Sequence, residues 1–261
     1  MLDNPWKIAA LVGVLVVLRI IAGAVKDSTQ RAFWVELFNS SLIAFALVFL
    51  LIRPLLLQAF FIPSGSMEPT LHAPDPYIRQ VGDRILVNKF IYRLGAPRRG
   101  DIVVFSAPDA ALYDRQQMAA LLQAGSRDYI KRVVGLSGDR IQIFADQGVY
   151  INGQLLDEPY INAVPSYNWP PRGEMEMASP PYLGTPTAPS YVWPGDQFGK
   201  PFVVPPGNIF VLGDNRNDSN DAHLWRDPTT GVALPALPLS AVEGRSLFIF
   251  WPLNRLGRLT Q

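Results

Sequence analysis

The sequence predicts a mostly β body, barrel-like in architecture and carrying an irregular insertion, preceded by two transmembrane helices. Three observations lead to this prediction. Two long apolar stretches occupy the first quarter of the 261-residue chain, short β-branched runs recur from Asp83 onward, and only 17% of the residues are charged. A chain of this length can bury a sizeable core, and its composition is typical of a protein that lies partly in lipid.

The first predicted elements are two apolar helices, over residues 8–25 and 37–52. Each stretch approaches the roughly 20 residues needed to span the hydrocarbon core of a bilayer. Arg19 interrupts the first stretch, and a charge at mid-span costs about 2.5–3.5 kcal/mol unless it snorkels or faces the other helix. A removable signal peptide is the alternative for the first stretch, although it lacks a basic start and an evident cleavage site.

The basic residues around these stretches predict an orientation. Lys26 and Arg31 lie between the two stretches, whereas Lys7 alone precedes the first. The positive-inside rule therefore places the short loop 26–33 in the cytoplasm. Residues 1–58 are predicted to form the membrane anchor, and the rest of the chain is predicted to be extracytoplasmic.

The β body is predicted from seven runs punctuated by Gly, Pro and Asp. The runs are RILVNKFIY, DIVVF, YIKRVVG, RIQIF, VYING, NIFVLG and RSLFIFW. Runs at this spacing are typical of an all-β barrel or sandwich. Residues 59–150 and 207–261 are therefore predicted to form the two parts of the core, with a helix or ordered excursion over 110–124.

A proline-rich segment separates the two parts of the predicted core. Residues 159–206 hold twelve of the 24 prolines, together with Trp169 and Trp193, and show no clean periodicity. Long stretches without periodicity are usually irregular excursions. Residues 151–206 are therefore predicted to form an insertion lobe outside the core.

The composition excludes several classes of function. The net charge is +1, which does not suggest the basic surface of a nucleic-acid-binding protein. The chain has no cysteine and only two histidines, His72 and His223. Disulfide scaffolds, thiol nucleophiles and Cys/His zinc sites are thereby excluded, and a Ser-His-Asp triad is difficult to build.

The first candidate site is the segment PSGSMEPTL, residues 63–71, directly after the second apolar stretch. Small residues between two prolines predict a tight turn that can expose a hydroxyl beside backbone N–H groups. Composition alone, however, favours a plain juxtamembrane linker.

The second candidate is Lys131 in the predicted strand DYIKRVVG. Strand alternation places Lys131 and Arg132 on opposite faces, and both faces look apolar. An arginine keeps its proton in a protein, whereas a desolvated lysine can lose it, and each unit of lowering of the pKa makes the neutral amine about tenfold more available. In isolation, a lysine whose stem packs while its ammonium snorkels to water is the more ordinary interpretation.

The third candidate is the polar segment GDNRNDSND, residues 213–221, which follows an apolar strand. It could be a solvated turn or a calcium-like ligand set, although it does not match the helix–loop calcium spacing. Alternatively, Ser219 and Asp221 could fix a nearby amine or arginine by hydrogen bonds.

Five motifs in order carry a resemblance to a known family. SGSMEPTL, GDRILVNK, RGDIVVF, YIKRVVGLSGD and GDNRNDSND, spread from about residue 60 to 251, resemble those of the bacterial type I signal peptidases, the membrane-anchored Ser/Lys endopeptidases. The resemblance implies that Ser66 is the nucleophile and Lys131 its general base. This agrees with the composition, because a histidine-poor chain still needs a proton acceptor and a desolvated lysine can serve.

The resemblance also implies the roles of the surrounding residues. The Ser64 hydroxyl and the backbone N–H of Ser66 would form the oxyanion hole, and Ser219 would hydrogen-bond and orient the Lys131 amine. Asp214 and Asp221 would support that loop. The family commonly continues with Ser-Arg after the second aspartate, whereas Ala222 and His223 follow here, so either His223 or Arg226 would have to balance Asp221.

The resemblance further implies the substrate and the surroundings. Apolar subsites would accept small side chains, as at the Ala-x-Ala end of a secretory signal peptide. The residues implied to line them are Ile62, Met67, Leu71, Tyr129 and Ile130. Four residues near the span would dip into the outer leaflet: Phe60, Phe61, Trp251 and Leu253.

The chain is thus expected to be a monomeric serine endopeptidase of the plasma (inner) membrane. Its partners would be secretory preproteins and the lipid bilayer, with no nucleic acid, metal or cofactor. A specialised pilin-processing or conjugation peptidase, or a self-cleaving regulator of the same Ser/Lys fold, is the alternative enzyme. An inactive membrane-tethered β domain that binds peptides is the alternative from another class, and intact Ser66 and Lys131 argue against it.

Overall fold

The computed structural model describes residues 5–52, 57–112, 127–178 and 190–259. The chain divides into two compact units, Met1–Gln58 and Ala59–Gln261. Each unit is described by itself below.

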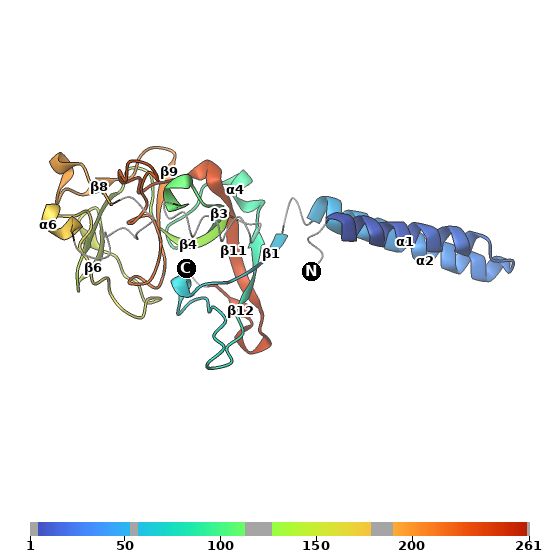
Figure 1. Ribbon diagram of the computed structural model, residues 1–261. Helices are drawn as coiled ribbons and strands as arrows, with labels where there is room; N and C mark the ends of the chain where they lie inside the picture. The colour runs from blue at the N-terminus through green and yellow to red at the C-terminus, as the bar shows by residue number, and fades with distance from the viewer. Residues whose placement is uncertain (1–4, 53–56, 113–126, 179–189, 260–261) are drawn as a thin grey trace. The chain divides into compact units, whose positions relative to one another are not determined.

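The first unit is a pair of helices that lie side by side (Figure 1). Helix α1 covers Pro5–Gly23, and α2 covers Ser28–Ala46 and continues into a π-helical segment, η1, Leu47–Ile52. Arg19 Nε donates to Asn39 Oδ1 on α2 at 3.2 Å, so this arginine faces the neighbouring helix. Such a contact is one of the two ways in which a mid-span charge becomes tolerable.

The predicted loop 26–33 is shorter in the structure. Asp27 caps α2, and its Oδ1 accepts hydrogen bonds from the backbone N–H groups of Thr29 and Gln30, each at 2.9 Å. An aspartate at this position satisfies N–H groups that a helix start otherwise leaves unpaired, so the helix begins at Ser28 rather than beyond residue 33.

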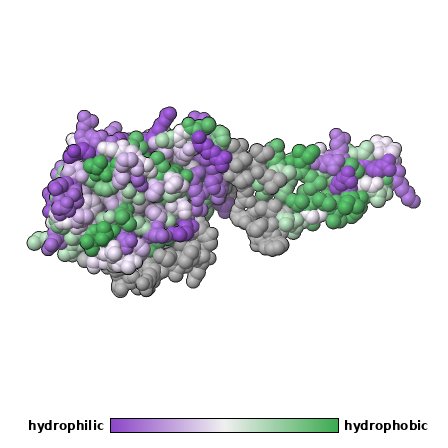
Figure 2. Space-filling model, turned by 90° about the horizontal axis from the view of Figure 1, so that it is seen from above, coloured by the Kyte–Doolittle hydropathy of each residue, from purple (hydrophilic) through white to green (hydrophobic). Residues whose placement is uncertain are grey.

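One helix among the described residues, Ser28–Phe49, is long and apolar enough to cross a membrane by length and composition. The apolar part of α1, Ala9–Gly23, is shorter. Hydrophobic side chains make up much of the surface of the helical unit that Figure 2 shows.

The second unit is built on two mostly antiparallel sheets. The larger has the order β1-β2-β11-β3-β4-β9-β10, with β12 paired to β11. Its strands are β1 Leu57–Phe61, β2 Arg84–Asn88, β3 Ile102–Ser106, β4 Asp128–Gly135, β9 Asn208–Leu212, β10 Leu237–Pro238, β11 Val242–Trp251 and β12 Gly257–Arg258. The smaller has the order β7-β6-β5-β8, with β5 Arg140–Phe144, β6 Gly148–Ile151, β7 Gln154–Leu155 and β8 Phe202–Val203.

Each of the seven β-branched runs overlaps one of these strands, which confirms the mostly β prediction. Short helical segments connect them: η2 Gly65–Met67, α4 Ile91–Leu94, η3 Asp109–Leu112, α6 Glu174–Met177, η4 Gly195–Gln197, η5 Leu239–Ala241 and η6 Leu253–Arg255. Most of the helix expected over 110–124 lies outside the described residues, which here end at 112.

The larger hydrophobic cluster joins both sheets and corrects one prediction. Trp169 and Trp193, from the proline-rich segment, are buried in it together with Phe105 and Phe210 of the larger sheet and Ile141 of the smaller. The Trp169 ring centroid lies 4.8 Å from that of Phe210. The prediction that residues 151–206 lie outside the core is therefore wrong for these aromatic side chains, because hydrophobic area is gained by burial whatever the periodicity of the backbone.

A second cluster takes the other face of β3, because Ile102 and Val104 belong to it whereas Val103 and Phe105 belong to the first. It contains Ile62, Met67, Leu71, Ile85, Val87, Ile102, Val104 and Ile249. Its first three members lie before, in and after the short turn η2, so burial of their side chains fixes that turn against the sheet.

Strand register brings two of the three candidate segments together, the Lys131 strand and the polar segment 213–221. Lys131 on β4 lies opposite Val103 on β3, and Arg132 lies opposite Leu212 on β9. The polar segment that starts at Gly213 therefore begins beside Lys131, at a point where β4 has become buried.

Candidate active site

The turn η2 presents Ser66 and is held from both sides. Met67 inserts into the second cluster and is completely buried. From the polar loop, the Asn215 backbone N–H donates to the Ser66 carbonyl oxygen, and Asn215 Nδ2 donates to the Gly65 carbonyl oxygen, each at 3.2 Å. The Ser66 backbone is thus fixed while its hydroxyl remains partly exposed.

The Ser66 hydroxyl meets the Lys131 amine. Lys131 Nζ lies 2.7 Å from Ser66 Oγ, and the Lys131 side chain comes from the middle of β4 with only 4% of the residue exposed. Burial lowers the pKa of Lys131 to about 8, against the opposing effect of the Asp221 and Asp214 carboxylates. The amine is therefore far more available as a base near neutral pH than an exposed lysine is.

Ser64 lies beside this pair. Its Oγ is 3.4 Å from Ser66 Oγ, and the residue is exposed. The two hydroxyls and the Lys131 amine thus cluster at one end of the turn η2.

Asp214 forms a buried ion pair with Arg132. Arg132 Nε and Nη2 contact the two carboxylate oxygens at 2.8 and 2.7 Å, and both side chains are fully buried. Thr70 Oγ1 donates to the same carboxylate at 2.5 Å. The Tyr160 ring lies under the guanidinium, 3.8 Å from its central carbon. Arg132 is therefore the cation that balances Asp214, and it uses the face of β4 opposite to Lys131.

Asp221 contacts His223, one of the two residues considered as its partner. His223 Nδ1 lies 2.5 Å from Asp221 Oδ1, and the Gly213 N–H donates to Oδ2 at 2.8 Å. Burial opposes ionisation of Asp221, but His223 and the Gly213 N–H lower its pKa below the usual range. The Tyr167 ring stacks on the imidazole, with centroids 4.3 Å apart.

The expected hydrogen bond between Ser219 and Lys131 is not formed. Ser219 Oγ is buried and has no hydrogen-bond partner among the described residues. The Ser219 side chain packs instead against Gly213, where an added Cβ would overlap Ser219 Oγ and the Ser66 carbonyl oxygen. The Lys131 amine points to Ser66, and this approach of three segments leaves no room for a side chain at Gly213.

A cavity of about 410 Å³ opens beside the Ser66–Lys131 pair. It is lined by Pro63, Ser64, Gly65, Ser66, Asp128, Tyr129, Ile130, Lys131, Asp218 and Asn220. Of the five residues expected to line subsites, Tyr129 and Ile130 line this cavity. Ile62, Met67 and Leu71 are buried in the second cluster instead, because apolar side chains next to a tight turn gain most by packing under it.

Sequence reasoning missed a second buried ion pair near the site. Arg216 forms two hydrogen bonds to the Glu158 carboxylate, at 2.8 and 2.6 Å, and its Nε donates to the Gly213 carbonyl oxygen at 2.9 Å. It therefore ties the polar loop to the proline-rich segment. The signal was present, since Arg216 is the one cation within the segment GDNRNDSND, but its partner could not be found from local spacing.

The chain matches the family described as "Signal peptidase, peptidase S26" over residues 34–251. It belongs to this family. The match covers most of the second unit and α2, and therefore all of the residues that form the site around Ser66 and Lys131.

Individual members of the family are similar over most of their length. The probable signal peptidase I-2 of Synechocystis sp. is 33% identical over 235 residues, which cover 90% of this chain and 81% of that protein. The signal peptidase I of Leptolyngbya laminosa is 36% identical over 208 residues, covering 80% and 75%. That of Mycobacterium tuberculosis is 31% identical over 254 residues, covering 89% and 76%. The chain is accordingly a serine endopeptidase of the signal peptidase I type, as the motifs predicted.

Proposed function

We propose that this S26 peptidase removes signal peptides from secretory preproteins with Ser66 as nucleophile and Lys131 as general base. The observation that carries the proposal is the 2.7 Å contact between Ser66 Oγ and a lysine amine whose burial lowers its pKa to about 8. A serine hydroxyl is a weak nucleophile until a neighbouring base accepts its proton, and a neutral amine can accept it.

The reaction then runs through an acyl-enzyme. The neutral Lys131 amine takes the hydroxyl proton as Ser66 Oγ attacks the scissile carbonyl carbon. The ammonium returns that proton to the leaving amine as the peptide bond breaks, which leaves an ester on Ser66. Lys131 next takes a proton from water as the water oxygen attacks the ester carbon. The bond to Ser66 Oγ then breaks and releases the acid, and the Lys131 ammonium returns its proton to Ser66 Oγ, which restores the hydroxyl and the neutral amine.

The negative charge that develops on the carbonyl oxygen needs hydrogen-bond donors. We assign these to the Ser66 backbone N–H and the Ser64 hydroxyl, which stands 3.4 Å from Ser66 Oγ. Each such donor, fixed before the reaction, is typically worth about 3–4 kcal/mol of transition-state stabilisation. The contacts from Asn215 to the turn support this role, because they fix the backbone that carries the N–H.

The substrate class follows from the cavity beside the dyad. The side chains of Tyr129 and Ile130 form an apolar part of the cavity wall. The cavity of about 410 Å³ has room for small side chains near the scissile bond. A small-x-small sequence meets that demand. An extended peptide laid along β4 would add main-chain hydrogen bonds without a sequence requirement. The turn η2 is supported by three buried side chains of the second cluster, those of Ile62, Met67 and Leu71.

The placement of the chain in a membrane is also part of the proposal. Both α1 and α2 cross the bilayer, the loop between them is cytoplasmic, and the catalytic unit is an extracytoplasmic monomer whose two sheets close in a barrel-like manner. The contact from Arg19 to Asn39 supports a paired anchor, and the hydrophobic cluster shared by both sheets supports closure. Phe61, Trp251 and Leu253 are exposed and suited to the outer leaflet, whereas Phe60 packs against the second cluster.

Incubation of the purified full chain with a preprotein that ends its signal in Ala-x-Ala tests the proposal. Ser66→Ala and Lys131→Met should each abolish cleavage, and mass spectrometry should place the wild-type cut after the second alanine. The matched controls are Ser240→Ala and Lys200→Met, which alter exposed residues and should cleave normally. Retained turnover by either dyad variant would contradict the mechanism.

A further inference from the structure

Glu158 belongs to the segment 151–206, which the sequence predicted to be an insertion lobe, yet its side chain is only 3% exposed. Its carboxylate accepts two hydrogen bonds from Arg216, at 2.8 and 2.6 Å, and one from the Tyr160 hydroxyl at 2.9 Å. Burial and the Glu158 charge raise the pKa of Tyr160, so this hydroxyl keeps its proton. None of these three side chains takes part in the reaction proposed above.

The Tyr160 ring lies between two buried guanidinium groups. That of Arg132 is 3.8 Å from the ring centroid, and that of Arg216 is 6.0 Å from it. Arg132 is paired with Asp214, and the side chains of all three charged residues are fully buried. Asp214 and Arg216 are thereby fixed directly before and after Asn215 in the chain.

Asn215 contacts the peptide unit that carries the Ser66 N–H. Its Nδ2 donates to the Gly65 carbonyl oxygen, and its backbone N–H donates to the Ser66 carbonyl oxygen, each at 3.2 Å. The Gly65 carbonyl and the Ser66 N–H belong to one planar trans peptide unit, in which they point in opposite directions. A hydrogen bond that fixes this carbonyl therefore also fixes the direction of the N–H, which is a donor assigned to the developing oxyanion.

We infer that Glu158 is a positioning residue for the cleavage reaction. It acts through Arg216 and Asn215 on the direction of the N–H donor. Paired hydrogen bonds between a carboxylate and a guanidinium restrict orientation as well as distance. The Arg216 guanidinium also donates through Nε to the Gly213 carbonyl oxygen at 2.9 Å, so its position determines that of the loop backbone. The inference rests on the proposed function, because the N–H donor belongs to that mechanism.

Steady-state cleavage of a fluorogenic small-x-small peptide by the full chain in detergent tests the inference. Glu158→Gln removes the charge that holds Arg216 and should lower kcat about tenfold or more. KM should stay within about twofold, because the donor acts on the transition state and Glu158 is not among the described residues that line the cavity. The measured kcat is divided by the folded fraction from tryptophan fluorescence, so that unfolding is not counted as lost catalysis. The pH of half-maximal activity should stay near 8, because Glu158 is not one of the carboxylates that act on the pKa of Lys131.

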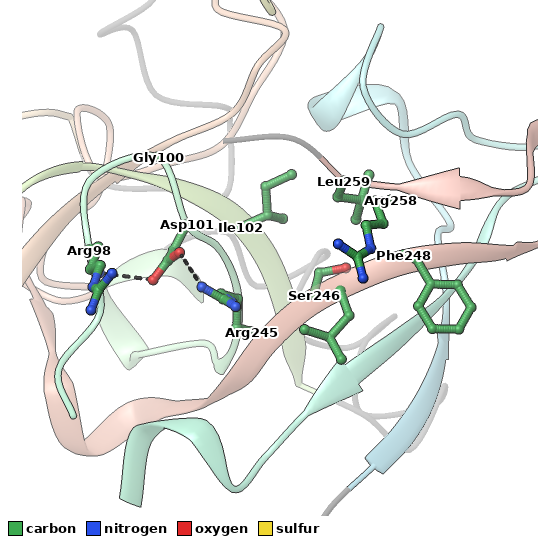
Figure 3. A pocket seen from close by; sticks show the side chains of 10 residues that line it. Arg98, Gly100, Asp101, Ile102, Arg245, Ser246, Phe248, Arg258 and Leu259 are labelled. Carbon is green, nitrogen blue, oxygen red and sulfur yellow. Dashed lines mark hydrogen bonds and ion pairs between the residues drawn. The ribbon is translucent and has the colours of Figure 1, made fainter. Parts of the chain in front are cut away.

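The matched control is Asp101→Asn, because Asp101 is also a buried carboxylate held by an arginine and a tyrosine. It accepts hydrogen bonds from Arg245 Nη1 at 3.2 Å (Figure 3) and from the Tyr92 hydroxyl at 3.0 Å. These partners belong to β11 and α4, so the corrected kcat of this variant should equal that of the wild type. If Glu158→Gln does not fold, Glu158→Gln/Arg216→Gln takes its place with the same expectations, since it leaves neither charge of the pair buried alone.

A double variant tests the route through Asn215. Asn215→Ala removes the donor to the Gly65 carbonyl, and adding Glu158→Gln to it should lower kcat by less than the product of the two single effects, because both act on one peptide unit. The inference would be overturned by an unchanged corrected kcat in Glu158→Gln, by an equal loss in Asp101→Asn, by a shifted pH midpoint or by fully multiplicative effects. Cleavage that survives Ser66→Ala would instead refute the proposed function, and the inference with it.

Discussion

The pH dependence of cleavage provides a sharp test of the arrangement around Lys131. If the amine is the base, kcat/KM should rise with pH through one ionisation near pH 8, the value to which burial lowers its pKa. At pH 7 a group of pKa about 8 is neutral in about one molecule in 11, whereas at the ordinary 10.5 it is neutral in about one in 3,000. The site therefore makes the base roughly 300 times more available at neutral pH.

The assay is kcat/KM for a fluorogenic peptide with a small-x-small cleavage site, measured from pH 5.5 to 10. With a pKa of about 8, activity at pH 6 should be roughly 1% of the plateau, and half of the plateau should be reached near pH 8. Circular dichroism at each pH verifies that the fold is retained. A flat profile, or a rise centred above pH 10, would refute the assignment of Lys131 as a buried base.

A substitution at Asp221 tests the direction of the electrostatic effect. The Asp221 carboxylate raises the pKa of Lys131, so Asp221→Asn should move the rise in activity to lower pH. The matched control is Asp196→Asn, an exposed aspartate on η4, which should leave the profile in place. A shift to higher pH in the Asp221 variant would show that this carboxylate does not act on the amine through its charge.

Two further predictions concern stability and close packing. The unfolded chain has a Lys131 pKa near 10.5 and the folded chain one of about 8, so the unfolded state binds more protons between these values and wild-type stability rises with pH across that window. Lys131→Met should therefore raise the free energy of unfolding at pH 7 by on the order of 3 kcal/mol. This gain in stability should disappear above about pH 10.5, and denaturant titration at several pH values would measure it. Gly213→Ala should remove activity and cost about 1–3 kcal/mol, because its Cβ would overlap Ser219 Oγ and the Ser66 carbonyl oxygen. Thermal unfolding and kcat/KM should differ far less for Gly95→Ala, where no atom lies within 4 Å of the added carbon.

The parts of the fold that follow from local patterns could be predicted from the sequence. Period-2 runs of β-branched residues locate strands wherever one face is buried, and the strand around Lys131 was found in this way. The same alternation separated Lys131 from Arg132, because neighbouring residues in a strand point to opposite faces. The structure gives each of these cations a different partner, Ser66 and Asp214.

The parts that depend on distant contacts could not be predicted. Trp169 has no periodic neighbours, yet it fills the space between the sheets, so only the tertiary fold reveals that it is core. The choice of His223 over Arg226 as the partner of Asp221 depends on how the chain turns after β9, since both side chains lie within five residues of the carboxylate. Ser219 was assigned to the amine by resemblance, and its position against Gly213 depends on a close approach that spacing does not encode.

The two carboxylates nearest to Lys131 explain why a buried lysine here can be a base at all. Asp214 and Asp221 each favour the ammonium form, and burial outweighs them. Each carboxylate also has a partner of its own, the Arg132 guanidinium for Asp214 and the His223 ring for Asp221. A carboxylate whose charge is balanced acts less strongly on a third group, so the Arg132 ion pair weakens the pull of Asp214 on the Lys131 proton while keeping that carboxylate in place. An exposed lysine at the same 2.7 Å from Ser66 would stay charged near neutral pH, because it would keep an ordinary pKa. A neutral amine near pH 8 therefore depends on the dry surroundings of β4, and the ion pair between Arg132 and Asp214 helps to maintain it.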